Sequence, residues 1–433
     1  MARRPSKRGY IRRVVDSEID DLLGSIRAIS LEGAKAVGKT ATALQRARTV
    51  HELDDEDQRS LIEADPLRLL EGERPILIDE WQRLPASWDL VRRDVDEQPR
   101  MAGAFLLTGS ASTADASTHS GAGRIVTVRM RPLTLSERGV ATPTVSLAAL
   151  LRGKRSRLGG VTSVKLRDYA EEILASGFPG LRGLTGRPLR AQLDGYIDRI
   201  TERDFPELGV TIRNPTALRR WLTAYAAASS TTASYETIRD AATGGQGEKP
   251  AKGTVGPYRD ALQRLWIVEP VPAWAPTRNQ LRRLSLPPKH QLVEPALAAR
   301  LLGVGVGALL GEQPAPALPA IPRDGTLLGA LFESLVTNDV RVAAQAAEAR
   351  VGHLRIAGGE HEVDLIVERD DGRVVAIEVK LSATIADRDL RHLKWLSGRM
   401  GNDLLDSIVV TTGSYAYRRP DGIGVVPAAL LGV

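Results

Sequence analysis

The sequence of 433 residues predicts an α/β fold, and two motifs near its start are the main reason. Residues 33–40, Gly-Ala-Lys-Ala-Val-Gly-Lys-Thr, match the phosphate-binding loop G-x-x-x-x-G-K-[ST] in full. This loop lies between a short apolar segment, residues 28–31, and a helical segment. The second motif is the apolar run 75–78, which Asp79 and Glu80 follow. Such a run is typical of a strand buried in a parallel sheet, whose carboxyl edge binds ligands.

The loop predicts a site for ATP, because its backbone N–H groups can surround phosphates and the next helix directs its positive end at them. Lys39 is expected to reach the β- and γ-phosphates, and the Thr40 hydroxyl to bind Mg²⁺. The remaining predicted phosphate contacts come from Gly33, Ala34, Lys35, Ala36, Val37 and Gly38. A glycine-containing turn with a surface lysine is the alternative, but the strand–loop–helix context argues against it.

The strand ends beside the loop supply the remaining candidates. Asp79 is expected to hold Mg²⁺, directly or through water, and Glu80 to activate the attacking water as a general base. A helix N-cap pair is the structural alternative for these two carboxylates. A third strand, residues 104–107, precedes Thr108 and Ser110, whose hydroxyls are candidates for sensing the γ-phosphate.

Arg124 precedes a further strand-like stretch, residues 125–128. An arginine there could reach the nucleotide of a neighbouring subunit and stabilise the transition state, which would require a homo-oligomer. A plain surface arginine is the alternative.

Composition narrows the class of protein. Charged residues make up 26% and hydrophobic residues 42%, as in ordinary globular proteins, and the absence of cysteine excludes disulfides and thiolate metal sites. The polar first thirteen residues lack a secretory signal, and the apolar stretch 301–311 is too short to span a membrane. The protein is therefore expected to be soluble and cytoplasmic, with no membrane partner. Six of those thirteen residues are basic, which suits either nucleic-acid contact or a solubilising tail.

Seven short motifs follow one another along the first part of the chain: Tyr10-Ile11-Arg12-Arg13, Gly33–Thr40, Asp65-Pro66, Asp79-Glu80-Trp81-Gln82, Leu106–Ser110, Gly123-Arg124-Ile125 and Arg131–Glu137. They serve here as landmarks. As a set they resemble the bacterial and archaeal AAA-type ATPases that carry an uncharacterised C-terminal domain. The resemblance implies an AAA-type ATP-binding domain at residues 1–140, a helical and winged-helix-like domain at 141–312 and a nuclease-like domain at 326–433.

The middle of the chain agrees with a winged helix. Helical segments at 216–228, 234–242 and 254–265 precede a strand-like pair, 266–269 and 290–293. If this domain binds DNA, the third segment is the recognition helix. The basic and aromatic residues available for DNA are Lys249, Lys252, Tyr258, Arg259, Arg264, Arg278, Arg282, Arg283 and Lys289. A pure packing module is the alternative. The proline-rich residues 313–322 suit a linker.

The C-terminal part carries a second group of charged residues. Asp364 lies in a predicted strand, and a turn leads to a second strand with Glu378 and Lys380 on one face. Glu333 lies on a predicted helix upstream. The pattern resembles the PD-(D/E)xK nuclease fold, with Val363 where that pattern has proline. The resemblance implies that Asp364, Glu378 and Glu333 bind Mg²⁺ or Mn²⁺, while Lys380 assists the attacking water at a phosphodiester. Carboxylates paired to Lys380 in a structural salt bridge are the alternative.

Three functional hypotheses follow. The first is a Mg²⁺-dependent ATPase coupled to a nuclease-like domain that acts on DNA. The second is an ATP-gated regulatory or protein-interaction switch with a catalytically inactive nuclease-like domain, and a slow ATP-binding scaffold is a third reading.

Overall fold

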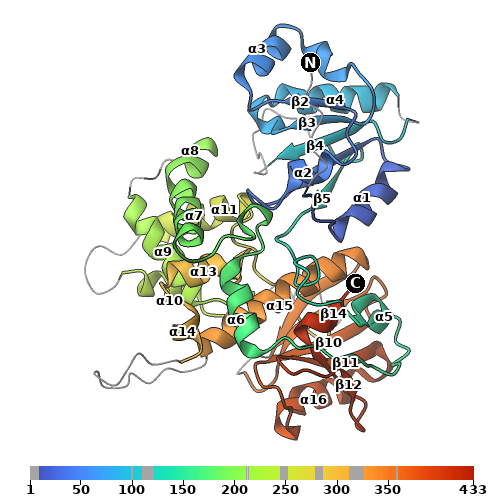
Figure 1. Cartoon of the computed structure of the whole chain (residues 1–433), viewed down its shortest axis with the longest axis vertical. Helices are drawn as coiled ribbons and strands as arrows, with labels where there is room; N and C mark the ends of the chain where they lie inside the picture. Colours follow the sequence, from blue (N-terminus) through green and yellow to red (C-terminus); the bar gives the residue numbers. More distant parts are fainter. Residues whose placement is uncertain are drawn as a thin grey trace. The chain divides into compact units, whose positions relative to one another are not determined.

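The computed structural model describes residues 9–98, 101–109, 121–210, 212, 214–243, 252–277, 286–311, 326–356 and 359–433. These form two compact units. Figure 1 labels their helices and strands. The first comprises described residues within 1–132, 178–180 and 260–267, and the second those within 133–177, 181–259 and 268–433. The second unit thus holds most of both the predicted middle domain and the predicted C-terminal domain. The three-domain boundaries stay a prediction.

The first unit is built on a parallel sheet of five strands in the order β2-β3-β4-β1-β5. The strands are β1 (Ala28–Glu32), β2 (Thr49–Glu52), β3 (Ile76–Asp79), β4 (Phe105–Gly109) and β5 (Ile125–Arg129). Ala28 of β1 pairs with Phe105 on one side and with Ile125 on the other. The predicted parallel sheet of a P-loop ATPase-like fold is therefore confirmed.

Helices cover both faces of this sheet, which explains its continuous apolar strands. On one face, Ile78 and Phe105 belong to a buried cluster with Ile62, Trp81 and Val91 from the covering helices. On the other, α1 and α2 pack against β1, and α2 also packs against β4. The helices of this unit are α1 (Val15–Leu23), α2 (Lys39–Ala43), α3 (Glu56–Ala64), η1 (Pro66–Leu70), η2 (Trp81–Arg83) and α4 (Ala86–Glu97).

The middle of the chain is helical. Its helices are α5 (Leu147–Leu151), α6 (Leu166–Ala175), η3 (Pro179–Leu181), α7 (Gly186–Arg199), η4 (Ile200–Asp204), α8 (Phe205–Glu207), α9 (Pro215–Ala227), α10 (Tyr235–Ala241), α11 (Lys252–Arg264), α13 (Pro295–Leu301) and α14 (Val306–Leu309). Helices α9, α10 and α11 lie where three helices were predicted. The predicted strand pair is present only as isolated antiparallel bridges, Val268 to Leu292 and Val271 to Lys289. The winged helix remains a prediction.

Two residues proposed for DNA contact are buried, and that part of the prediction is wrong. Tyr258 is only 4% exposed and its ring meets Phe205 edge-on, so it belongs to the core. Lys289 is 0% exposed. Several other predicted sites lie outside the described residues: Ser110, Lys249, Arg278, Arg282, Arg283, the side chain of Lys252, residues 1–8 of the basic arm and the segment 313–322.

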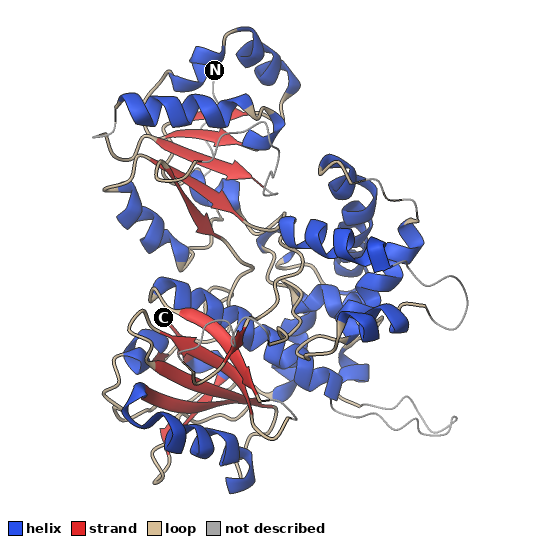
Figure 2. Cartoon of the chain, turned by 180° about the vertical axis from the view of Figure 1, so that it is seen from behind, coloured by secondary structure: helices blue, strands red, loops and turns tan. Residues whose placement is uncertain are grey.

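The C-terminal part contains a mixed sheet of seven strands in the order β12-β13-β11-β10-β9-β8-β7, drawn in red in the lower part of Figure 2. The strands are β7 (Ala273–Trp274), β8 (Arg350–Arg355), β9 (Glu362–Glu368), β10 (Val374–Lys380), β11 (Leu404–Thr411), β12 (Tyr417–Arg418) and β13 (Gly424–Pro427). The strands β9 and β10 are antiparallel neighbours, as predicted, with Ile377 opposite Leu365. A separate parallel pair joins β6 (Val145–Ser146) to β14 (Leu431–Gly432).

Two helices pack against this sheet. Helix α15 (Thr326–Ala346) contacts β8, β9 and β10, and it carries Glu333. Helix α16 (Arg391–Met400) buries Leu393 and Leu396 in a cluster with residues of β9 and β10. The shorter helices are η5 (Asp387–Leu390), η6 (Gly401–Asp403) and η7 (Ala428–Leu430). Across the described ranges, no helix is both long enough and apolar enough to cross a membrane.

Candidate functional site

The phosphate-binding loop connects β1 to α2, as the sequence predicts, and its backbone depends on glycine. Gly38, just before α2, has a φ of 98°, a conformation that costs glycine little. A Cβ atom on Gly33 would lie 2.3 Å from the carbonyl oxygen of Met130, closer than real Cβ contacts. Ala36 also has a positive φ of 67°. Both glycine positions of the motif therefore have a steric cause in this chain.

Lys39 lies inside this loop. Its side chain is buried, and its Nζ donates hydrogen bonds of 2.9 and 3.0 Å to the carbonyl oxygens of Gly33 and Ala34. Burial lowers the pKa of Lys39 to about 8, although the carboxylate of Glu80 opposes this shift. The ammonium is thus held by neutral carbonyl groups at the position where the motif expects phosphate.

Three side chains converge where β1, β3 and β4 end. The Thr40 hydroxyl donates a 2.8 Å hydrogen bond to Oδ1 of Asp79, and the Thr108 hydroxyl donates to the same oxygen. Burial raises the pKa of Asp79, and the two hydrogen bonds oppose that rise. Hydroxyl and carboxylate oxygens are the hard ligands that Mg²⁺ prefers. Thr40 and Asp79 therefore fit the magnesium ion that the motif implies.

Glu80 has an unusual backbone. Its φ of 54° and ψ of 45° are left-handed, a region that residues other than glycine rarely occupy. Its backbone N–H donates to Oγ1 of Thr108 at 3.3 Å, and the Gln82 amide donates to its carboxylate. Strained residues held in place by neighbours are frequent at functional sites. Gln82 was not among the predicted site residues, although its landmark motif contains it.

Arg13 also supports the loop, and sequence reasoning did not assign it a role. Its guanidinium donates to the carbonyl oxygens of Val37 at 2.7 Å and of Arg131 at 2.6 Å. Nearby, the Tyr10 hydroxyl bonds to Asp16 and to Thr42 of α2. In the sequence, the landmark Tyr10–Arg13 was the one feature that could have indicated this support of the loop.

The end of β5 adds a second basic residue that the sequence did not single out. Arg129 lies with its guanidinium 3.9 Å from the centre of the Trp266 ring, and its Nη1 donates to the Met130 carbonyl oxygen at 3.2 Å. Burial raises the pKa of Glu32, while the charges of Arg129 and Lys39 oppose the rise. Arg129 thus belongs to the electrostatic surroundings of the loop.

Arg124 contacts an acidic residue of its own unit. Its Nε lies 2.7 Å from Oδ1 of Asp96, at the end of α4, and the side chain is 42% exposed. This contact is compatible with a plain surface arginine. Because the structure holds one chain, a role of Arg124 in the site of a neighbouring subunit stays a prediction.

The C-terminal candidates gather around a lysine. Glu333, Glu362, Asp364 and Glu378, here named the acidic cluster, lie on α15, β9 and β10. The Nζ atom of Lys289 lies 2.8 Å from Glu333, 3.2 Å from Asp364 and 3.6 Å from Glu362. Lys380 donates a 2.7 Å hydrogen bond to Oε1 of Glu378. Asp364 also accepts a hydrogen bond of 2.8 Å from the backbone N–H of Val379.

This arrangement does not fit the predicted Mg²⁺ or Mn²⁺ ion. A divalent ion needs several oxygen ligands at about 2.0–2.6 Å, and an ammonium already lies among these carboxylates. Within the described part of the chain, no three His, Cys, Asp or Glu side chains are arranged to hold a metal ion. The Lys380–Glu378 pair is the salt bridge that the structural alternative expected.

The electrostatics of the cluster agree with an internal cation. Burial raises the pKa of Glu333 to about 8, and the charge of Asp364 adds to the rise while Lys289 opposes it. Burial and Asp364 likewise raise the pKa of Glu378 to about 8. Burial alone would lower the pKa of Lys289, but the charges of Asp364 and Glu333 outweigh the effect of burial and raise this pKa. Lys289 therefore remains an ammonium.

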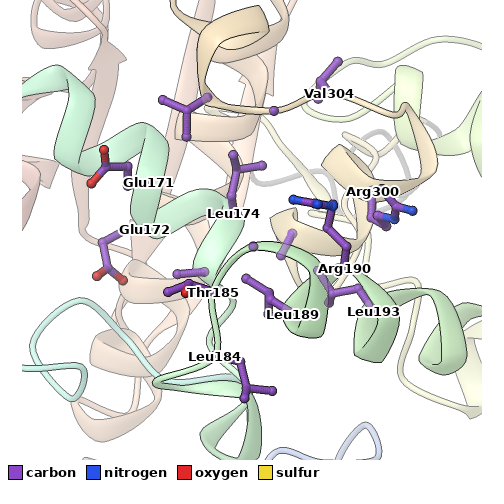
Figure 3. A pocket seen from close by; sticks show the side chains of 15 residues that line it. Glu171, Glu172, Leu174, Leu184, Thr185, Leu189, Arg190, Leu193, Arg300 and Val304 are labelled. Atoms are coloured by element: carbon purple, nitrogen blue, oxygen red, sulfur yellow. The ribbon is translucent and has the colours of Figure 1, made fainter.

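A cavity of about 470 Å³ lies elsewhere in the second unit, between α6, α7 and the segment 296–306 (Figure 3). Leu174, Leu189 and Leu193 form part of its apolar wall, and Arg190 and Arg300 lie at one side. Arg300 is bound to Asp194 at 2.6 Å. None of the predicted site residues lines this cavity.

Comparison with known proteins agrees with the ATPase-like fold of the first unit. Residues 25–138 match the AAA domain family, and residues 166–306 and 328–431 match two domains of unknown function, DUF8612 and DUF4143. Uncharacterized proteins of Mycobacterium bovis and Mycobacterium tuberculosis are each 27% identical over 426 residues, covering 96% of this chain and 83% of theirs. The AAA match spans the loop, Asp79 and Glu80, and it supports ATP binding and hydrolysis.

Two solved structures are similar at a lower level. A Walker-type ATPase of Pyrococcus abyssi has 15% identity and a TM-score of 0.40, covering 68% of this chain and 99% of that chain. The ORC2 protein of Aeropyrum pernix, solved in ADPNP–ADP complexes, has 12% identity and a TM-score of 0.32, covering 69% and 95%.

Proposed function

We propose that this chain is a Mg²⁺-dependent ATPase whose nucleotide site is formed by the loop 33–40 with Asp79, Glu80 and Thr108. The observation that carries the proposal is the 2.8 Å hydrogen bond from Thr40 to Asp79. It brings together a hydroxyl from the loop and a carboxylate from a separate strand, which is the oxygen pair that Mg²⁺ bound to ATP requires.

The chain's own residues account for the steps of hydrolysis. Lys39 exchanges its two carbonyl partners for β- and γ-phosphate oxygens, which are better partners for an ammonium because they are charged. Thr40 and Asp79 would hold Mg²⁺, which neutralises charge on the phosphates. Glu80 takes a proton from water as the water oxygen attacks the γ-phosphorus and the bond to the ADP oxygen breaks. Gln82 orients the Glu80 carboxylate through its amide.

ATP hydrolysis by two variants tests these roles. Lys39→Ala should lose most ATP affinity, because it removes the loop's buried cation. Glu80→Gln should bind ATP but hydrolyse it about 10²–10⁴-fold more slowly, the range that a general base contributes. Glu63→Gln, on the exposed side of α3, is the matched control and should behave as wild type. Equal turnover by wild type and Glu80→Gln would rule out the role of Glu80.

For the C-terminal part, we propose the ATP-gated switch in place of an active nuclease. Binding of ATP would alter protein contacts, and the nuclease-like domain would not cleave DNA. The supporting observation is Lys289, whose ammonium lies among the carboxylates that a metal-dependent nuclease needs free.

Plasmid nicking with Mg²⁺ or Mn²⁺, with and without ATP, separates the two readings. The switch predicts no nicking above background by wild type or by Asp364→Ala. Metal-dependent nicking by wild type that Asp364→Ala abolishes, with ATP hydrolysis unchanged, would restore the nuclease reading and its DNA substrate.

A further inference from the structure

A buried lysine side chain lies within the acidic cluster. We infer that Lys289 is the built-in cation of this cluster, taking the place of a divalent metal ion, so that the cluster binds such an ion only when this side chain is absent. The inference concerns metal binding at Glu333, Glu362 and Asp364 and does not depend on ATP hydrolysis.

The backbone on both sides fixes the position of Lys289. Its N–H and C=O groups exchange hydrogen bonds of 2.9 and 2.8 Å with Val271. The next residue, His290, lies with its ring 5.0 Å from that of Tyr225 and 4.9 Å from that of Tyr235. Its Nε2 lies 2.7 Å from the Ala233 carbonyl oxygen. The backbone at Lys289 is therefore held by a packed segment, and this places the start of its side chain beside the cluster.

The same segment is linked to the helix that carries Glu333. Gln291 donates from its amide to Oγ of Ser230 at 2.9 Å, and this hydroxyl donates to the Ala330 carbonyl oxygen of α15 at 2.8 Å. Ala330 lies one turn before Glu333. The lysine and its 2.8 Å partner are thus positioned by one continuous set of contacts.

Charge repulsion opposes a second cation beside Lys289. The ammonium lies within 3.6 Å of three carboxylates, so a divalent ion sharing those oxygens would sit a few ångströms from it. Inside a protein, water screens the repulsion between a double and a single charge at about 4 Å far less than it does in bulk solution. The lysine and a divalent ion therefore exclude each other.

Without the lysine, the same oxygens would suit a metal. Glu333, Glu362 and Asp364 all point at the place where Nζ lies. On β10, Glu378 Oε2 is a buried carboxylate oxygen without a hydrogen-bond partner. Removing Nζ would leave Glu333, Glu362 and Asp364 without the cation that they share, and carboxylate oxygens are hard ligands that Mn²⁺ accepts once they move closer around it.

The test is the number of Mn²⁺ ions bound per chain, measured by electron paramagnetic resonance of free Mn²⁺ without nucleotide. Lys289→Ala should bind one more Mn²⁺ than wild type, and Lys289→Ala with Asp364→Asn should lose it again. Lys154→Ala, an exposed lysine, is the matched control and should bind as wild type. A folded Lys289→Ala that gains no Mn²⁺ overturns the inference.

A second comparison decides the matter if Lys289→Ala does not fold. Wild type and Asp364→Asn should bind the same number of Mn²⁺ ions, because the intact lysine keeps the cluster free of metal. One Mn²⁺ fewer in Asp364→Asn would overturn the inference. Failure of ATP hydrolysis would leave both Mn²⁺ comparisons unchanged, so this inference and the proposed ATPase fail independently.

Discussion

The Nη1 atom of Arg13 donates a 2.7 Å hydrogen bond to the carbonyl oxygen of Val37, within the phosphate-binding loop. The same guanidinium binds the Arg131 carbonyl oxygen at 2.6 Å. The segment before α1 therefore connects the loop to the residues that follow β5. The loop's shape, on which its phosphate-facing N–H groups depend, is supported from outside the motif.

Arg13→Ala should weaken ATP binding. The change removes a charged donor from a buried carbonyl group, which costs about 1.5–3 kcal/mol. This is equivalent to roughly 10–150-fold in affinity if the loop of the variant becomes ordered only when ATP binds. Calorimetric titration with ATP measures the change. Arg12→Ala removes a neighbouring but exposed arginine and should bind as wild type. If both variants bind ATP equally well, Arg13 does not support the loop.

Thr40→Val should separate the magnesium-dependent part of ATP affinity from the rest. It removes a proposed Mg²⁺ ligand and the hydrogen bond to Asp79 while keeping the side-chain shape. Affinity measured with Mg²⁺ should fall about tenfold or more, roughly 1.4 kcal/mol, whereas affinity in EDTA should change little. Ser60→Ala, on the exposed side of α3, serves as the control. An equal loss in both conditions would contradict the magnesium role.

Arg124→Ala tests the action of one subunit on another. If Arg124 acts in trans, turnover should rise with protein concentration as subunits associate, and the variant should lose about 10³-fold or more in turnover while keeping ATP affinity. Arg92→Ala is a matched control, because Arg92 also pairs with Asp96. A protein that stays monomeric with ATP at full turnover would leave Arg124 as a surface residue.

Asp339 should make the second unit less stable as the pH rises. Its carboxylate accepts hydrogen bonds from the Leu135 N–H, yet burial raises its pKa from 3.8 to about 7, against the opposing charge of Arg138. A carboxyl with a raised folded pKa contributes its full stability below the unfolded value and loses it as the pH rises through the folded value. Wild type should therefore lose stability relative to Asp339→Asn between about pH 4 and pH 7, by up to about 4 kcal/mol.

Urea unfolding of both proteins at several pH values measures this difference. The exposed Asp403→Asn controls for general effects of pH. A constant difference between wild type and Asp339→Asn across the range would show that Asp339 has an ordinary pKa in the folded protein.

Much of the first unit follows from the sequence, because its signals are local. Apolar runs buried on both faces predict β1, β3 and β4, and the loop is a single stretch whose glycines have steric causes close by. The β9–β10 hairpin is also predictable, since its strands are joined by a short turn. The helices α9, α10 and α11 follow from their periodicity, but the strand pair after them is reduced to isolated bridges.

Tertiary structure alone decided which long basic side chains are buried and which groups they contact. Arg12 and Arg13 are adjacent and chemically identical, yet only Arg13 is buried against the loop. The sequence around Lys289 predicts a surface residue, because its partners Glu333 and Asp364 lie 44 and 75 residues further along the chain. A lysine can be buried only where distant carboxylates replace its water, and that replacement is a property of the packed chain. The sequence by itself therefore determined the nucleotide loop, and the fold determined whether the acidic cluster is open to a metal ion.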